Sequence, residues 1–163
     1  MIKFHVPYEV VGKGNALKPI IRPGGSFGLA QPKHVTANAL TLHGEFLKFR
    51  PEKPFDVPVW VSYCIVYPWR TVDRKKREKG KFGEMEPKET RYDLGQLTKQ
   101  LDDVLQRCGF VRDDALIAEY RHVGKYWGDD HRVGVEVAID AIGNFQTSPG
   151  PDQITAPSSR GEG

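Results

Sequence analysis

The chain has 163 residues, of which 39% are hydrophobic and 28% are charged, and its formal net charge is +3. This length and composition suit one globular domain with a single core, and they exclude a fibrous or disordered protein. No run approaches the roughly 18 consecutive apolar residues of a membrane helix, and the N-terminus lacks the apolar stretch of a secretory signal. With only two cysteines, Cys64 and Cys108, we expect reduced thiols in a cytoplasmic protein.

The first half of the chain predicts two strands and one helix. Alternating apolar residues predict a strand over residues 2–11, and a stretch rich in proline and glycine follows at 19–32. Apolar residues at helical spacing then predict a helix over 35–49. The clearest strand covers 57–67, and apolar side chains on both of its faces favour a central place in a sheet.

Residues 70–81 form a strongly basic segment, with seven bases against two acids. Such a segment repels itself, and we expect a mobile loop here. It would attract phosphate groups, although a solvated basic loop without a partner fits the same pattern.

The second half predicts a helix over 93–107, a strand over about 116–126 and a last strand over 132–142. Asp93 is a suitable N-cap for the helix and Gly109 a suitable stop. The element order indicates an α+β fold, with a mixed sheet covered by two main helices, in which the helix over 93–107 is a candidate crossover connection.

The domain is expected to cover residues 1–142. The remainder, 143–163, is rich in glycine, proline and serine and is predicted to be a disordered tail.

Several kinds of chemistry are poorly supported. No G-x-S-x-G elbow is present, and the glycines of residues 24–28 lack the Lys-Ser/Thr of a phosphate-binding loop, which indicates a flexible loop. The five histidines show no zinc-ligand spacing.

The acidic residues carry more information. Asp93 begins a helix, Lys99 lies within it, and Asp113 and Asp114 precede a strand. If the connection doubles back, Asp93 and Asp114 converge near Lys99. Carboxylates beside a lysine and a basic surface can hold Mg²⁺ and support phosphodiester hydrolysis. The alternative is an ordinary helix cap at Asp93 and a turn at the second pair.

The segment from Asp93 through Lys99, followed by Gly109-Phe110 and Asp113-Asp114, resembles the RusA family of Holliday-junction resolvases. That family carries D-x-D-N-L-x-K, then a helix, then G-x-x-x-D-D. The resemblance implies that Asp93, position 95 and Asp114 bind the catalytic metal. Asp113, next to Asp114, is a further candidate ligand on its position alone. The resemblance also implies that Lys99 supports cleavage.

One position departs from the family pattern. The second aspartate of D-x-D is Gly95 here, and the asparagine that follows is Gln96. Three explanations remain open: another carboxylate (Asp113, Asp103 or Glu89) completes the site, the protein binds junctions with little activity, or Gly95 is an introduced inactivating substitution. A small structural or regulatory protein with an accidental motif match is a further alternative.

The resemblance implies a Mg²⁺-dependent endodeoxyribonuclease, with Mn²⁺ able to substitute, that acts in recombination and repair in the cytoplasm of a bacterium or phage-infected host. Its partners would be four-way DNA junctions and a second copy of itself, since a C2 homodimer presents two identical sites to a two-fold junction. Basic residues are the candidates for phosphate contact: Arg74, Lys75, Lys76, Arg77, Arg121 and Lys125.

Overall fold

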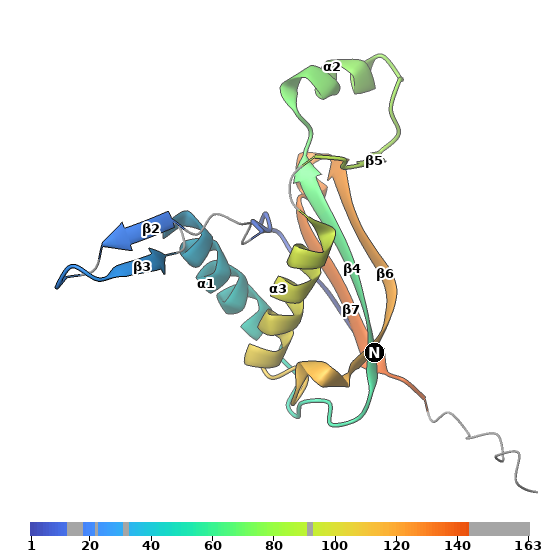
Figure 1. The fold of residues 1–163 in the computed structure, drawn as a ribbon. Coiled ribbons are helices and arrows are strands. Elements are labelled where there is room, and N and C mark those ends of the chain that lie inside the picture. The colour runs from blue at the N-terminus through green and yellow to red at the C-terminus, as the bar shows by residue number, and fades with distance from the viewer. Residues whose placement is uncertain (13–17, 22, 31–32, 91–92, 144–163) are drawn as a thin grey trace, which may run out of the picture.

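The structure is a computed structural model and describes residues 1–12, 18–21, 23–30, 33–90 and 93–143. It is an α+β fold with three α-helices, a five-stranded mixed sheet and a separate two-stranded hairpin (Figure 1). In chain order the helices and strands are β1 (Ile2–Val6), β2 (Lys18–Ile21), β3 (Phe27–Ala30), α1 (Lys33–Leu47), β4 (Val59–Pro68), α2 (Thr71–Glu78), β5 (Met85–Pro87), α3 (Leu94–Arg107), β6 (Ile117–Gly128) and β7 (Gly134–Ala141). Two short 3-10 turns, η1 (Asp114–Leu116) and η2 (Asp130–Arg132), flank β6.

The sheet has the strand order β1-β7-β4-β6-β5, which confirms a central place for β4. β4 is parallel to β6 and antiparallel to β7, while β1 and β5 are the antiparallel edges. The connection from β4 to β6 contains α3, so the predicted crossover is confirmed. β6 therefore starts close to the C-terminal end of α3.

Helices α1 and α3 lie side by side against one face of the sheet (Figure 1). The core between these layers includes Phe4, Phe46 and Phe110, whose rings contact one another with centroids 5.2–6.3 Å apart. Tyr63 of β4 and Leu101 of α3 are also fully buried there. None of the helices in the described part of the chain has the length and hydropathy that crossing a bilayer requires.

The limits of α3 follow the sequence signals. Asp93 caps the helix by accepting a hydrogen bond from the Gln96 backbone N–H at 3.1 Å. Gly109 has a φ of +76°, which a residue with a side chain adopts at a cost, so the helix ends where the sequence predicts.

The predicted mobile loop over 70–81 is wrong, because residues 71–78 form helix α2, a third helix beyond the two predicted. Asp73 is buried and forms ion pairs with Arg70 and Lys76, which are three residues away on either side. These pairs offset part of the positive charge within the helix itself.

A second difference lies at residues 18–30, where the sequence indicates only an irregular stretch. Here β2 and β3 form an antiparallel hairpin that projects from the body of the fold (Figure 1). Gly24 and Gly25, with φ of +99° and +83°, form the turn of the hairpin rather than a flexible loop. Ile21 and Phe27 flank this turn and are exposed. The predicted disordered tail lies outside the described residues, except for residue 143.

Candidate functional site

The N-terminal end of α3 holds the first part of the predicted motif. Asp93 is exposed, and its Oδ1 lies 3.1 Å from the position that a Cβ on Gly95 would occupy. A side chain at residue 95 would therefore lie directly beside the Asp93 carboxylate. Gly95 itself contributes no ligand atom from a side chain.

A shallow groove of about 410 Å³ runs between α3 and β6. We call it the α3 groove, and its lining residues are Leu94, Gly95, Thr98, Lys99, Asp102, Tyr120 and Val123. Lys99 is exposed in the middle of the groove, between Gly95 at one end and Asp102 and Tyr120 at the other. The groove thus offers one exposed cation, Lys99, in a largely apolar lining, and this ammonium group is the part of the groove to which a phosphate can bind.

Asp102 is a buried carboxylate held by two tyrosines. Tyr63 donates a hydrogen bond to its Oδ1 at 2.7 Å and Tyr120 donates one to its Oδ2 at 2.6 Å. Burial raises the pKa of the Asp102 carboxyl, the two hydroxyl donations lower it in part, and the negative charges of Asp103 and Asp114 raise it further. Burial, with Asp102 nearby, also raises the pKa of Tyr63 and of Tyr120.

This raised pKa predicts a measurable pH dependence of stability. Asp102 keeps its proton to higher pH in the folded state than in the unfolded state, where its pKa is about 3.9. Between the pKa of Asp102 in the unfolded state and its higher pKa in the folded state, the folded protein therefore binds more protons. The free energy of unfolding falls as the pH rises through this range. Asp102→Asn is expected to lose this decrease while keeping polar partners for both tyrosines.

Urea denaturation gives the free energy of unfolding of the wild type and of Asp102→Asn at each pH between 4 and 8. The effect of Asp102 is the difference between the two curves of free energy against pH. All other titrating groups are shared, so curves that run parallel through this range would show that Asp102 has an ordinary pKa.

The second half of the motif lies at the other end of α3. Asp113 caps η1 by accepting a hydrogen bond from the Ala115 backbone N–H at 2.9 Å, and Asp114 is the exposed first residue of that turn. η1 packs against α3, and the charge of Asp114 acts on Asp102, which is nine residues beyond Asp93. Nine residues of helix span about 13 Å. The structure therefore places Asp93 and Asp114 near opposite ends of α3 and does not bring them together within one chain.

This separation bears on metal binding. Mg²⁺ needs several oxygen ligands at about 2 Å from one ion. Among residues 1–143, as far as the structure describes them, no group of three His, Cys, Asp or Glu side chains could hold a metal ion. The proposed replacements do not change this result: Asp103 lies on the α1 side of α3, and Glu89 lines a separate cavity with Asp73 and Glu86. The described side chains of a single chain thus do not fit a complete divalent-metal centre.

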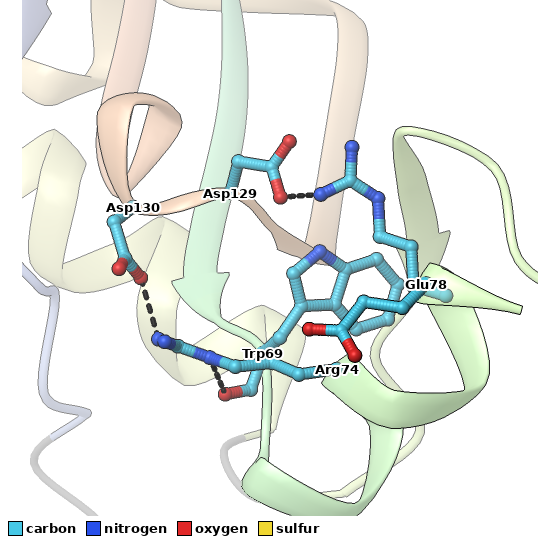
Figure 2. A pocket seen from close by; sticks show the side chains of 6 residues that line it. Trp69, Arg74, Glu78, Asp129 and Asp130 are labelled. Carbon is cyan, nitrogen blue, oxygen red and sulfur yellow. Dashed lines mark hydrogen bonds and ion pairs between the residues drawn. The ribbon is translucent and has the colours of Figure 1, made fainter.

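The basic helix α2 is tied to the turn between β6 and β7. Arg74 Nη2 lies 2.7 Å from Asp130 Oδ1, and Arg77 forms an ion pair with Asp129 (Figure 2). Arg74 also donates to the backbone oxygen of Trp69 at 3.3 Å. Two of the arginines expected to contact phosphate therefore have carboxylate partners in the free protein.

The other predicted phosphate contacts differ in their surroundings. Lys75 is exposed on α2, and the described residues give it no ion pair. Lys76 lies 3.7 Å from Asp73. Arg121 lies over the Trp60 ring at 4.1 Å and pairs with Glu119 at 3.2 Å, while Lys125 donates to the Thr90 backbone oxygen at 3.2 Å.

Sequence reasoning missed Asp102 and its two tyrosines. The available signal was its position between Leu101 and Val104 on the apolar side of the helix, where a charged residue needs a partner. Its partners come from β4 and β6, and neither pairing leaves a mark in the local sequence.

A comparison with known protein families finds a match. The family sequence profile described as Endodeoxyribonuclease RusA matches residues 7–139, which include the helix α3 and the strand β6 that form the α3 groove. A search of curated protein sequences gives no match.

Proposed function

The chain belongs to the RusA endodeoxyribonuclease family, and from that premise we propose that it recognises four-way DNA junctions and cleaves them by divalent-metal-dependent phosphodiester hydrolysis in recombination and repair. The observation that carries this proposal is the family match across residues 7–139. In support, the motif residues Asp93, Lys99 and Asp114 are all solvent-exposed, and Lys99 lines the α3 groove.

Basic surfaces supply the affinity for DNA in this proposal. Residues 10–44 contain four Lys or Arg and no Asp or Glu, and this stretch includes the projecting β2–β3 hairpin and most of α1. The α2 helix adds the exposed Lys75, with Arg74, Lys76 and Arg77 next to it. Lys and Arg contact phosphates without regard to sequence, which suits an enzyme that selects DNA by its branched shape.

Within the α3 groove, Lys99 would hold a phosphate of the bound strand. Asp93 and Asp114 are too far apart to share one ion in a single protomer, so we assign them to different stretches of that strand. Mg²⁺, or Mn²⁺ in its place, supplies Lewis-acid chemistry in nucleases of this kind. The described side chains of one chain do not by themselves complete a centre for such an ion.

A homodimer is part of the proposal. Resolution of a junction requires two cuts related by its two-fold symmetry, and two copies of one groove related by a C2 axis meet that requirement.

One observation, the absence of a side chain at Gly95, favours a second function, which is junction binding with little or no cleavage. If the metal site is incomplete for this reason, the chain would bind junctions and cut them slowly or not at all.

The test uses a synthetic four-way junction and a duplex of the same sequence. Binding is measured in EDTA, and cutting is measured with Mg²⁺ and then Mn²⁺. We expect tighter binding to the junction than to the duplex by about 10³-fold or more and, with metal, paired symmetric nicks. Equal affinity for junction and duplex would contradict both functions, and binding without nicks would select the second.

A further inference from the structure

The β2–β3 hairpin presents two large apolar side chains to solvent. Ile21 is the last residue of β2 and Phe27 the first of β3, and the two lie directly opposite each other beside the turn. Their side chains are 71% and 82% exposed. Single exposed apolar residues are ordinary on a soluble protein. A cross-strand pair at the far end of a projecting element instead indicates a contact surface (Figure 1). We call Ile21 and Phe27 the hairpin tip.

The hairpin is slim and long enough to reach the inside of a duplex. A Cβ built on Gly24 or Gly25 would meet no other atom within 4 Å, so the turn beyond the tip adds little bulk. Each strand has four residues, which rise about 13 Å. The grooves of B-DNA are about 7.5–8.5 Å deep. A ribbon of this length can therefore bring its tip to the base pairs.

The charge of the surrounding sequence identifies the partner. Residues 10–44 contain no acid, and their four bases include Lys18, which begins β2, and Arg22, the neighbour of Ile21 in sequence. Packing this hairpin against the same hairpin of a second copy would bring like charges together, which is unfavourable. DNA has the opposite charge, and its apolar base faces lie between rows of phosphates. An apolar pair within a basic stretch fits that arrangement.

Apolar side chains act on DNA as wedges. Proteins insert Phe, Leu, Ile or Met between successive base pairs, and the separation of the two bases costs stacking energy. At the branch point of a four-way junction the stack is already interrupted, so insertion costs less there than in continuous duplex. An exposed Phe beside an exposed Ile would thus contribute more binding energy at the branch point than elsewhere.

We propose that the hairpin tip inserts Phe27, supported by Ile21, between base pairs at the branch point of the DNA substrate, and that this contact favours junctions over unbranched DNA. This inference rests on the proposed function, because it takes branched DNA as the ligand.

The experiment measures binding in EDTA to a four-way junction with 2-aminopurine at the branch point and to a duplex labelled at its centre. The fluorescence of 2-aminopurine rises when the base leaves the stack. The wild type is expected to cause this rise in the junction only. The double variant Ile21→Thr/Phe27→Thr keeps β-branched side chains suited to a strand. It is expected to lose the rise and to bind the junction about tenfold more weakly, as for loss of one stacked aromatic side chain, with unchanged affinity for the duplex.

Three single variants serve as controls. Phe27→Leu keeps an apolar wedge and is expected to keep the fluorescence rise. Lys18→Gln removes a charge and is expected to weaken binding to junction and duplex alike. Val57→Thr alters another exposed apolar side chain, in the loop before β4, and is expected to behave as the wild type. Because the tip is exposed, the double variant should also keep the melting temperature of the wild type.

The remaining outcomes distinguish the two proposals. If the double variant keeps both the fluorescence rise and the junction affinity, the inference fails while the proposed function stands. A lower melting temperature would show that the tip packs within the fold. A smaller species in sedimentation without DNA would show that it joins two copies of the chain. Either result would overturn the inference. If the wild type binds junction and duplex equally, both proposals fail.

Discussion

Replacing Gly95 with aspartate is expected to raise the rate of junction cleavage by at least about 100-fold. Loss of an outer-shell partner of a metal ligand typically costs roughly 10–100-fold in activity, and loss of a ligand itself costs no less. A carboxylate at residue 95 would lie beside Asp93, since a Cβ there is 3.1 Å from Asp93 Oδ1. Two adjacent carboxylates at the N-terminal end of a helix form the start of a divalent-cation site.

The fold tolerates this change. Gly95 is exposed in the first turn of α3, and its backbone is not in the left-handed region. The Asp93 carboxylate must move by only a few tenths of an ångström. An acid in the first turn also favours the helix through its dipole. Gly95→Ala is the matched control, because it gains helix propensity without a carboxylate.

Single-turnover cleavage of a four-way junction with Mg²⁺ measures the gain, and calorimetric titration with Mn²⁺ measures ion binding independently. If the alanine variant cuts as fast as the aspartate variant, the gain comes from helix stability and not from a restored ligand.

Asp114→Asn is expected to reduce cleavage by the Gly95→Asp variant by less than about tenfold, because Asp114 lies at the far end of α3 and is not a ligand beside Asp93 and residue 95. Affinity for the junction in EDTA is expected to stay the same or increase. The substitution removes a negative charge near phosphates, which explains the expected direction of the affinity change. Asp114 is exposed and the capping hydrogen bond of η1 belongs to Asp113, so the fold should be unaffected.

Asp113→Asn is the matched control, because its amide oxygen can still accept from Ala115. An independent readout comes from Asp102, whose pKa should decrease in the Asp114 variant but not depend on cleavage. Undiminished cleavage by Asp114→Asn would confine the site to the N-terminal end of α3 and the neighbouring Lys99, whereas a loss as large as that of a metal ligand would contradict the expected result.

The elements that could be predicted from sequence are those whose signals are local. α3 has an apolar stripe, a capping aspartate and a terminating glycine within 17 consecutive positions, and each of these signals is present in the structure. β4 has apolar side chains on both faces, and it lies at the centre of the sheet.

The features that could not be predicted depend on partners distant in sequence. α2 is a run of like charges when taken alone, and the carboxylates that pair with Arg74 and Arg77 lie more than 50 residues further along the chain. Likewise, Asp102 is held by Tyr63, 39 residues earlier. The motif itself gave no indication that Asp93 and Asp114 lie near opposite ends of α3, because a spacing in sequence does not fix the direction in which a connection returns.

The ion pairs of α2 also change how its charge should be counted when DNA binds. A free arginine that meets a phosphate releases a condensed counterion, and the number of such releases sets how steeply affinity falls with ionic strength. Arg74 and Arg77 already have Asp130 and Asp129 as counterions, so a phosphate that contacts them must first displace a carboxylate of the same molecule. Lys75, which has no carboxylate partner among the described residues, contributes its full share. The attraction of the helix for DNA phosphates is therefore lower, and its salt dependence shallower, than its sequence suggests.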